Sequence, residues 1–276
     1  MLDGRERFLP RPRVGLSDAV ADQLRTRILA GAHHDGDLLP KQEELMEEFG
    51  VSKPALREAL RILETEGLVE VRRGNVGGAV VRIPQPEGAA YTLGLVLQAR
   101  GVPFAEIGTA LQHLEPVCAG LCAGRADRKK TVVPALRASQ RQLRQAVKRD
   151  DAAGVLGAAR GFHESLVTHC GSETLIVLVG TLEALWTAQA RAIGDSAAAA
   201  GRQHDPEFRA QTIEAHDDIL GNVDNGDIDL ATKSARLHLE NAHLHPDPAP
   251  LDQPVEAATV RDHYFRSSYS KNGTTK

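Results

Sequence analysis

The chain has 276 residues, with 42% hydrophobic and 25% charged side chains and a formal net charge of −4 at pH 7. This is the composition of a globular protein, and it excludes a chain that is disordered, collagen-like or built on disulfides throughout. The negative net charge also excludes a protein that coats nucleic acid through bulk positive charge. Because single hydrophobic cores rarely exceed about 250 residues, we expect two domains.

The sequence does not predict a membrane anchor. The longest nearly unbroken apolar stretch, 174–182, reaches about half of the roughly 20 residues that a membrane-spanning helix requires. The N-terminus has no apolar signal-peptide core. We therefore expect a cytoplasmic protein without a membrane partner.

The N-terminal part of the chain predicts a basic arm followed by helices. Residues 1–15 contain several arginines and have no apolar period, which is typical of a flexible arm. Apolar residues then recur at every fourth position from Leu16 until Gly31, which predicts a first amphipathic helix. A short second helix is expected between Leu39-Pro40 and Gly50.

A third helix and a hairpin follow. Ser52 is a favourable N-cap, and Pro54 lies in the first helical turn, where its missing N–H does no harm. A helical apolar stripe continues until Gly67. Two β-branched runs, 68–73 and 79–83, then flank a glycine-rich turn and predict a short hairpin. Helices followed by a hairpin in this order predict a winged helix-turn-helix.

The third helix presents a row of cations. Lys53, Arg57 and Arg61 recur every four residues on the side away from the apolar stripe, so one helix face offers three cations to phosphates or guanine edges. Arg72 and Arg73 add positive charge at the wing. A charge row alone is typical of a solvated helix face, but its position on the recognition helix of this fold favours DNA binding.

The rest of the chain predicts an all-helical domain, so the expected fold is mainly α. The winged helix-turn-helix occupies 16–84, residues 85–88 read as a linker rich in proline and glycine, the helical domain spans 89–245, and the polar tail 246–276 is expected to be mostly disordered. The expected helices of this domain are 89–100, 103–124, 131–149, 151–170, 173–193, 206–223 and 227–244.

The N-terminal motifs resemble the signature of GntR-family transcription regulators. The motifs are Leu39-Pro40, Gly50-Val51-Ser52-Lys53-Pro54-Ala55-Leu56-Arg57-Glu58-Ala59-Leu60, Leu63-Glu64, Glu66-Gly67-Leu68-Val69 and Arg73-Gly74. The resemblance implies that Ser52, Lys53 and Arg57 contact bases and phosphates. It also implies that Arg73 and Gly74 reach toward the minor groove.

The second helix departs from the family pattern. Relatives often carry an arginine near its start that touches DNA, whereas this chain has Gln42-Glu43-Glu44 and leaves Lys41 as the cation there. The resemblance therefore implies Lys41 as the DNA contact of this helix, and this departure means that the family pattern does not predict the operator sequence.

The helical half resembles the FCD effector domain found in the FadR branch of that family. Its landmarks are Leu114-Glu115-Pro116, Ala119, Leu121, Phe162-His163, Glu214-Ala215-His216, Ile219-Leu220 and His238-Leu239. The resemblance implies that His163, His216 and His238 converge and hold a divalent metal beside the effector, and imidazole is a good ligand for Zn or Ni. The family's fourth ligand is an aspartate one turn before Phe-His, where this chain has Ala159.

Two interpretations of the three histidines stay open at this stage. They bind a metal that water or the effector completes, or they are polar lining of an effector pocket or core residues with satisfied hydrogen bonds. The resemblance implies a ligand-responsive regulator, expected to be a repressor, which binds a palindromic DNA operator as a homodimer and responds to a small-molecule effector.

Two other classes of function compete with this hypothesis. A metal-dependent enzyme could use the His163, His216 and His238 cluster, but no carboxylate pair, nucleophile elbow or phosphate loop accompanies it in the sequence. An architectural DNA-binding protein would leave the large helical domain unexplained. We therefore expect a regulator rather than an enzyme.

Overall fold

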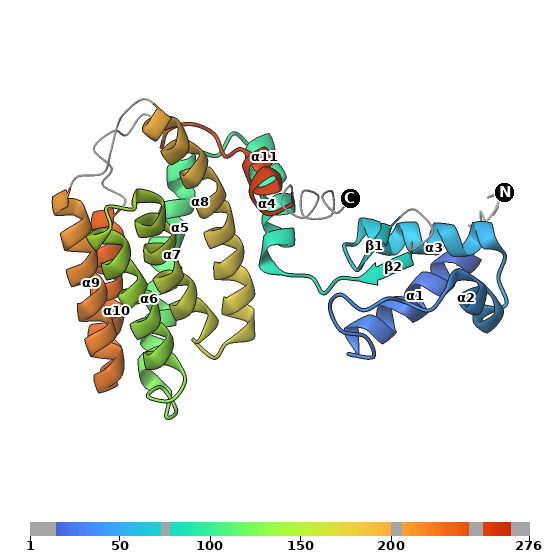
Figure 1. Ribbon diagram of the computed structural model, residues 1–276, viewed down its shortest axis with the longest axis horizontal. Coiled ribbons are helices and arrows are strands. Elements are labelled where there is room, and N and C mark those ends of the chain that lie inside the picture. The colour runs from blue at the N-terminus through green and yellow to red at the C-terminus, as the bar shows by residue number, and fades with distance from the viewer. Residues whose placement is uncertain (1–14, 73–77, 200–205, 243–250, 266–276) are drawn as a thin grey trace, which may run out of the picture. The chain divides into compact units, whose positions relative to one another are not determined.

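The computed structural model describes residues 15–72, 78–199, 206–242 and 251–265. The chain divides into two compact units, Met1–Pro84 and Gln85–Lys276 (Figure 1), and each unit has its own hydrophobic core. The first unit is a winged helix-turn-helix and the second is a helical bundle, so the predicted fold class is confirmed.

The first unit packs three helices against a two-stranded antiparallel sheet. Its elements are α1 (Leu16–Leu29), α2 (Gln42–Phe49), α3 (Lys53–Thr65), β1 (Val69–Arg72) and β2 (Gly78–Val81). Val69 pairs with Val81, and Arg72 pairs with Gly78. Gly50 ends α2 in the left-handed region, at φ 62°. Glycine adopts this conformation without the steric penalty that a Cβ brings, and the turn into α3 depends on it.

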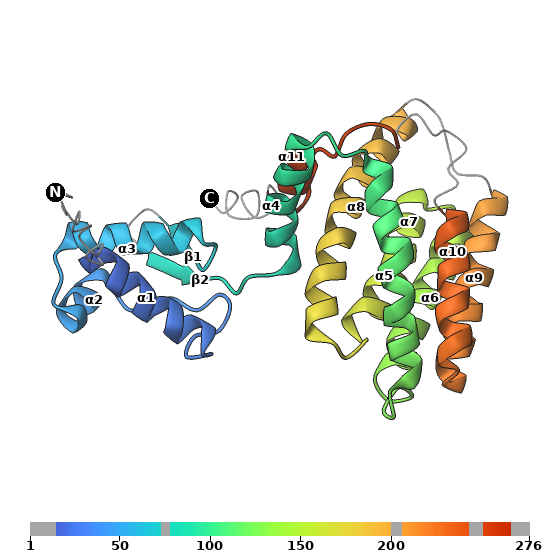
Figure 2. The same ribbon diagram turned by 180° about the vertical axis from the view of Figure 1, so that it is seen from behind.

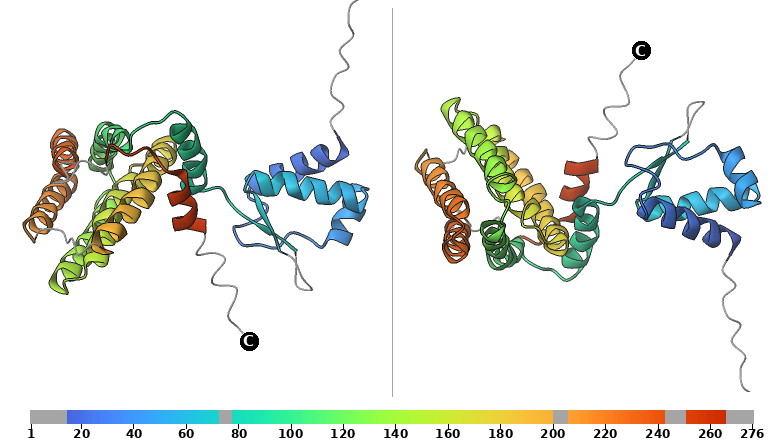
Figure 3. Two further views of the ribbon diagram at one scale, coloured as in Figure 1. Left: turned by 90° about the horizontal axis from the view of Figure 1, so that it is seen from above. Right: turned by 90° about the horizontal axis from the view of Figure 1, so that it is seen from below.

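The second unit is a bundle in which α5 contacts most of the other helices. Its long helices are α4 (Pro86–Ala99), α5 (Phe104–Gly124), α6 (Val132–Lys148), α7 (Ala152–Thr168), α8 (Glu173–Ala199), α9 (Pro206–Asn225) and α10 (Ile228–Ala242). The helices α9 and α10, both orange, run side by side and pack on α5 (Figure 1 and Figure 3). Small residues allow the close approach, since a Cβ on Gly120 of α5 would lie 2.4 Å from the hydroxyl of Thr232.

The prediction that residues 85–88 form a linker is wrong. Pro86, Glu87 and Gly88 are the first residues of α4, and Gln85 is its N-cap. Proline and glycine there resembled a loop, but proline is well tolerated in the first turn of a helix because the N–H that it lacks would have no partner inside the helix.

The prediction of a mostly disordered tail is wrong for residues 251–265. This segment forms the short helix α11 (Ala257–Val260) and a π-helical turn, η1 (Arg261–Phe265), and α11 lies against α4 (Figure 2). Val255 and Val260 are buried, and the Val255 backbone N–H donates to the Val102 carbonyl at 2.9 Å. Contacts with residues about 150 positions earlier order the segment, and local sequence patterns do not reveal such contacts.

Helix α8 deserves a separate description because it is long and apolar. By length and composition alone, its residues Glu173–Gly194 could cross a membrane. In the bundle, one side of this helix packs on α4, α5 and α7, and Val179 and Leu185 are almost fully buried there. A core helix of a bundle meets the same criteria, because burial against other helices selects the same apolar residues.

Candidate functional site

The recognition helix α3 separates its buried and charged faces. Leu56 and Leu63 are fully buried, and the opposite face exposes Lys53, Arg57 and Arg61. The guanidinium of Arg61 lies 4.0 Å from the carboxylate of Glu58. Among the residues that the structure describes, Lys53 and Arg57 form no ion pair.

The other predicted DNA contacts lie around this helix. Ser52 is the N-cap of α3 with an extended backbone, and its exposed side chain makes no capping hydrogen bond. Lys41 is exposed and precedes α2, and its backbone N–H donates to the Glu44 carboxylate at 3.0 Å. Arg73 and Gly74 lie outside the described residues.

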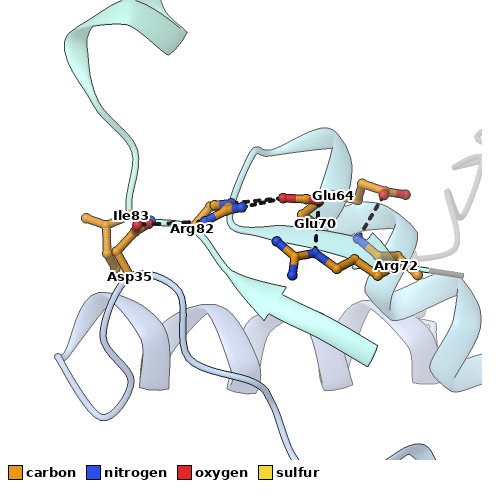
Figure 4. A network of polar contacts seen from close by, with 7 residues as sticks. Asp35, Glu64, Glu70, Arg72, Arg82 and Ile83 are labelled. Atoms are coloured by element: carbon orange, nitrogen blue, oxygen red, sulfur yellow. Dashed lines mark hydrogen bonds and ion pairs between the residues drawn. The ribbon is translucent and has the colours of Figure 1, made fainter. Parts of the chain in front are cut away.

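A polar network fixes the base of the wing (Figure 4). Glu70 on β1 accepts from the Nε of Arg72 at 3.2 Å and from the guanidinium of Arg82. Hydrogen bonding from Arg82 lowers the pKa of Glu70, and this effect together with that of Arg72 outweighs the opposite effect of burial. Asp35 accepts from the backbone N–H of Ile83 at 2.9 Å and so ties the end of the wing to the loop after α1. The Arg72 guanidinium, unlike that of Arg57, is therefore already paired within the chain.

The three predicted histidines converge inside the helical unit. His163 comes from α7, His216 from α9 and His238 from α10. The Nε2 atom of His238 lies 3.1 Å from Nε2 of His216 and 3.2 Å from Nε2 of His163, and one ring nitrogen of each residue lies within 4.8 Å of the others. His216 is 0% exposed and His238 is 6% exposed.

A buried carboxylate orients His163. Glu115 on α5 is 2% exposed and lies 2.5 Å from Nδ1 of His163. Because a carboxylate accepts, Nδ1 of His163 carries the proton and Nε2 directs its lone pair at the other two rings in the neutral imidazole. Burial lowers the pKa of His163, but the charge and hydrogen bond of Glu115 outweigh burial and bring this pKa above its ordinary value. Likewise, burial raises the pKa of Glu115, and His163 reverses the shift.

Glu183 continues this chain of contacts from α8. Its side chain hydrogen-bonds with Glu115, and burial, followed by the charge of Glu115, raises the pKa of Glu183 well above the ordinary value. This shift favours the protonated form of Glu183, which is the form that can donate to the Glu115 carboxylate.

His216 is held as a neutral ring. It stacks on Phe162 with ring centroids 4.1 Å apart and planes 7° from parallel. Burial, followed by the charges of His163 and His238, lowers the pKa of His216 well below its ordinary value. Its Nδ1 atom is buried and has no hydrogen-bond partner among the described residues. A neutral imidazole with a free Nε2 lone pair is the form that binds a metal.

The two distances from Nε2 of His238 to the other Nε2 atoms suit ligands of one divalent metal. With Zn–N bonds of about 2.0–2.1 Å, two ligand nitrogens lie about 2.9 Å apart at a right angle and about 3.4 Å apart at the tetrahedral angle. The distances of 3.1 and 3.2 Å fall within this range. Three histidines could therefore hold a metal here. Ala159, one turn before His163, supplies no fourth donor atom.

Sequence reasoning found the three histidines but missed what Glu115 and Glu183 do. Glu115 was expected only as part of the Leu114-Glu115-Pro116 landmark, and nothing near Glu183 in the sequence signals a role. An acidic residue in an otherwise apolar helical stripe was the available signal, since a buried carboxylate requires a partner.

The fold and the exposed cations of α3 define a DNA-binding transcription regulator. Comparison with known proteins gives the family. Residues 16–80 match the model of bacterial regulatory proteins of the gntR family, and residues 106–241 match that of the FCD domain. The chain belongs to the gntR family and carries an FCD domain.

Individual relatives agree with this assignment. The chain is 30% identical to the Uxu operon regulator of Haemophilus influenzae over 225 residues, which covers 82% of this chain and 79% of that protein. It is 45% identical over 67 residues to the HTH-type transcriptional regulator Mce2R of Mycobacterium tuberculosis, a match to 24% of this chain and only 28% of that relative. Streptococcus agalactiae GntR shares the fold, with a TM-score of 0.63 at 20% identity over 82% of this chain and 98% of that one.

The family also decides between the classes of function. Its members, including the relatives above, are transcription regulators, so the metal-dependent enzyme that the histidine cluster suggested is not supported and the protein is a regulator.

Proposed function

We propose that this protein is a cytoplasmic, ligand-responsive repressor that binds a palindromic operator as a homodimer and responds to a small metabolite bound in the helical unit. The observation that carries the proposal is the exposed face of α3, where Lys53 and Arg57 have no ion pair among the described residues. Cations that are already exposed and unpaired bind phosphates or guanine edges without first breaking a contact inside the protein.

The proposed DNA contacts are the predicted residues Lys41, Ser52, Lys53, Arg57, Arg61, Arg72, Arg73 and Gly74. Their roles differ in our proposal. Arg57, near the middle of the exposed face, reads a base edge. Arg72 is held by Glu70, so it contacts phosphate only after giving up that bond and contributes less.

A homodimer follows from the geometry of recognition. A helix of 13 residues such as α3 reads only a few base pairs, and a two-fold protein on a palindrome doubles the contacts. We place the dimer interface in the helical unit. Sedimentation at micromolar concentration tests this proposal, and a monomer that still binds its operator tightly contradicts it.

The proposed metal is Zn or Ni, held by His163, His216 and His238 through their Nε2 atoms. A bound divalent ion supplies positive charge and open coordination positions, to which a carboxylate or hydroxyl of an effector can bind. The protein contributes the orientation of the rings through Glu115 and Phe162 and a buried surrounding that excludes bulk water.

The experiment is a gel shift on the DNA upstream of the protein's own gene, with and without added metabolites. We expect specific binding that one class of metabolite weakens. Specific binding that no metabolite changes contradicts effector control, and the absence of specific binding to any genomic fragment contradicts the regulator as proposed. A reporter fused to that promoter distinguishes repression, where deletion of the protein raises expression, from activation.

A further inference from the structure

A cavity of about 220 Å³ lies in the helical unit, separate from the histidine cluster. Four elements line it: the start of α4, one face each of α7 and α8, and the turn η1. Its charged and hydroxyl-bearing side chains are Glu87, Arg160, Glu164, Thr168, Glu183, Thr187 and Tyr264. Sites for drug-sized ligands measure about 300–1,000 Å³, so a cavity of this volume suits a small metabolite.

Three charged side chains of the cavity, those of Glu87, Arg160 and Glu164, have no hydrogen-bond or ion-pair partner in the part of the chain that the structure describes. Arg160 and Glu164 lie one turn apart on α7, and Glu87 faces them from the first turn of α4. Arg160 and Glu87 are half-buried. Half-buried charges without a partner are costly unless water or a ligand satisfies them.

The hydroxyl groups of Tyr264 and Thr187 also have unused hydrogen-bonding capacity. Burial raises the pKa of Tyr264 to about 12, so its hydroxyl keeps the proton and can donate. Thr187 is 4% exposed and lines the cavity from α8. Neither hydroxyl has a hydrogen-bond partner among the described residues. In contrast, Glu183 is engaged by Glu115, so it is not counted among the free carboxylates.

The free groups include one guanidinium, two carboxylates, and the hydroxyls of Thr187 and Tyr264. A simple anion would pair with Arg160 but would face Glu87 and Glu164, and a simple cation would face Arg160. A ligand that carries both charges satisfies all three charged groups, with its carboxylate on the planar guanidinium of Arg160 and its ammonium group between the two carboxylates. We propose that this cavity is a second ligand site, which binds a small zwitterion with one carboxylate and one ammonium group, such as an amino acid.

The position of the cavity gives such a ligand two routes of influence. The start of α4 follows Pro84, the last residue of the DNA-binding unit, along the chain. Glu183 lies on the cavity wall and also bonds to Glu115, which orients His163. The start of α4 and η1 lie outside the segments that match the two family models, so the cavity is built partly from segments beyond those matches.

The test is calorimetric titration of the full-length protein with each of the protein amino acids. We expect at least one to bind. We also expect its C-terminal amide and its N-acetyl derivative to bind at least about tenfold more weakly, because each lacks one charge. Arg160→Gln and Glu164→Gln should each weaken binding by about tenfold or more, and Tyr264→Phe should have a smaller effect because it removes one neutral hydrogen bond.

Two variants serve as controls. Arg141→Gln removes an exposed arginine of α6 outside the cavity and should leave binding unchanged. Glu106→Gln alters an exposed carboxylate of α5 that does not line the cavity and should also leave binding unchanged. A melting curve for each variant verifies that it is folded.

The proposal is overturned if no amino acid binds or if Arg160→Gln binds as tightly as the wild type. These outcomes are independent of the gel shift, because no DNA is present. Calorimetry therefore tests the second site, and the gel shift tests the regulator. Either proposal can fail while the other holds.

Discussion

The recognition helix and the histidine cluster use charged and polar side chains in opposite ways. The cations of α3 are exposed to solvent and lie on one helix, and Lys53 and Arg57 form no ion pair with any described residue. The histidines come from three helices, are largely buried, and contact one another at 3.1 and 3.2 Å. Substitutions on α3 should therefore have nearly additive effects, whereas substitutions in the cluster should have coupled effects.

This difference extends to what surrounds each group. An exposed cation is screened by water and salt, and its surroundings have little influence on it. In the cluster, the hydrogen bond with Glu115 places the proton of His163 on Nδ1. Burial, and to a lesser extent the charges of His163 and His238, favour the neutral form of His216. In our proposal the cluster acts as one unit, and its affinity for a metal depends on residues that would not touch the metal.

The largest effect is expected for His216→Ala. The change removes one of three imidazoles, so we expect the affinity for Zn to fall on the order of 100-fold or more, and the rise in melting temperature on adding Zn to disappear. Metal content and melting curves of the wild type and the variant measure both quantities.

Ala159→Asp provides the opposite change at the same site. It places a carboxylate one turn before His163 and should raise both the affinity for a divalent ion and the metal-dependent melting shift. The wild type, His216→Ala and Ala159→Asp are compared. If all three have the same metal content and none changes its melting temperature on adding metal, the histidines line a pocket or belong to the core.

A smaller effect is expected for Glu115, which contacts His163 and in our proposal would influence the metal only through that ring. Glu115→Ala should lower metal affinity by about 10–100-fold. Glu115→Gln keeps an oxygen that accepts from Nδ1 of His163 but loses the charge, so its loss should be smaller. Competition with a chromophoric chelator measures the affinities, and nitrogen NMR of His163 reports whether the proton remains on Nδ1.

The matched control on the same helix is Glu106→Gln, which alters an exposed carboxylate of α5. It should leave metal affinity unchanged. If Glu115→Ala keeps the wild-type affinity while its fold is intact, Glu115 does not position His163 for a metal.

Local patterns predicted most of the helices because their signals are local. The buried stripe of Leu56, Leu60 and Leu63 follows the helical period, and Gly50 and Gly67 end their helices at positive φ. For the same reason the three histidines could be assigned to their helices. Their convergence was inferred only from the resemblance to a family.

The parts that the sequence could not reveal depend on contacts between distant segments. Glu115 and His163 are 48 positions apart, and no periodic pattern joins them. Val255 and Val260 are isolated apolar residues in a polar stretch, and their burial depends on the surface that α4 and α8 provide. The cavity at Tyr264 was missed because it needs this ordered tail.

Among the exposed cations of α3, Arg57 is expected to matter most. Arg57→Ala should weaken operator binding by about 1–3 kcal/mol, or roughly 5–150-fold. If Arg57 makes bidentate hydrogen bonds with a guanine, the loss of affinity will be confined to operators that carry that base. If it contacts phosphate, all sequences will weaken alike and the slope of log affinity against log salt will fall by about 1. Fluorescence anisotropy at several salt concentrations separates these cases.

The losses of binding free energy in Lys53→Ala and Arg57→Ala should be nearly additive in the double variant, because in our proposal the two exposed cations contact DNA independently. Arg141→Gln on α6 is the control for removal of an exposed cation. Unchanged affinity for specific DNA in both single variants of α3 would remove this helix face from the interface.

The smallest effect is expected for Glu70. Its side chain is 35% exposed, so it is less exposed than the cations of α3 and less buried than the histidine cluster. Hydrogen bonding from Arg82 keeps the pKa of Glu70 below its ordinary value of 4.5. A carboxyl with a lowered folded pKa stabilises the fold fully above its unfolded pKa, and this contribution is lost as the pH falls through the folded pKa. Glu70→Gln should therefore destabilise the wing at pH 7 by less than about 1 kcal/mol, since the ion pair is partly solvated.

The difference between Glu70→Gln and the wild type should shrink as the pH falls below about 4.5, because protonated Glu70 then resembles glutamine in charge. Hydrogen exchange of peptides covering 64–72 in the full-length protein measures local stability at each pH, and Glu43→Gln on the exposed side of α2 is the control. A difference that stays constant from pH 7 to pH 3 would mean that the substitution acts through packing rather than through the ion pair with Arg82.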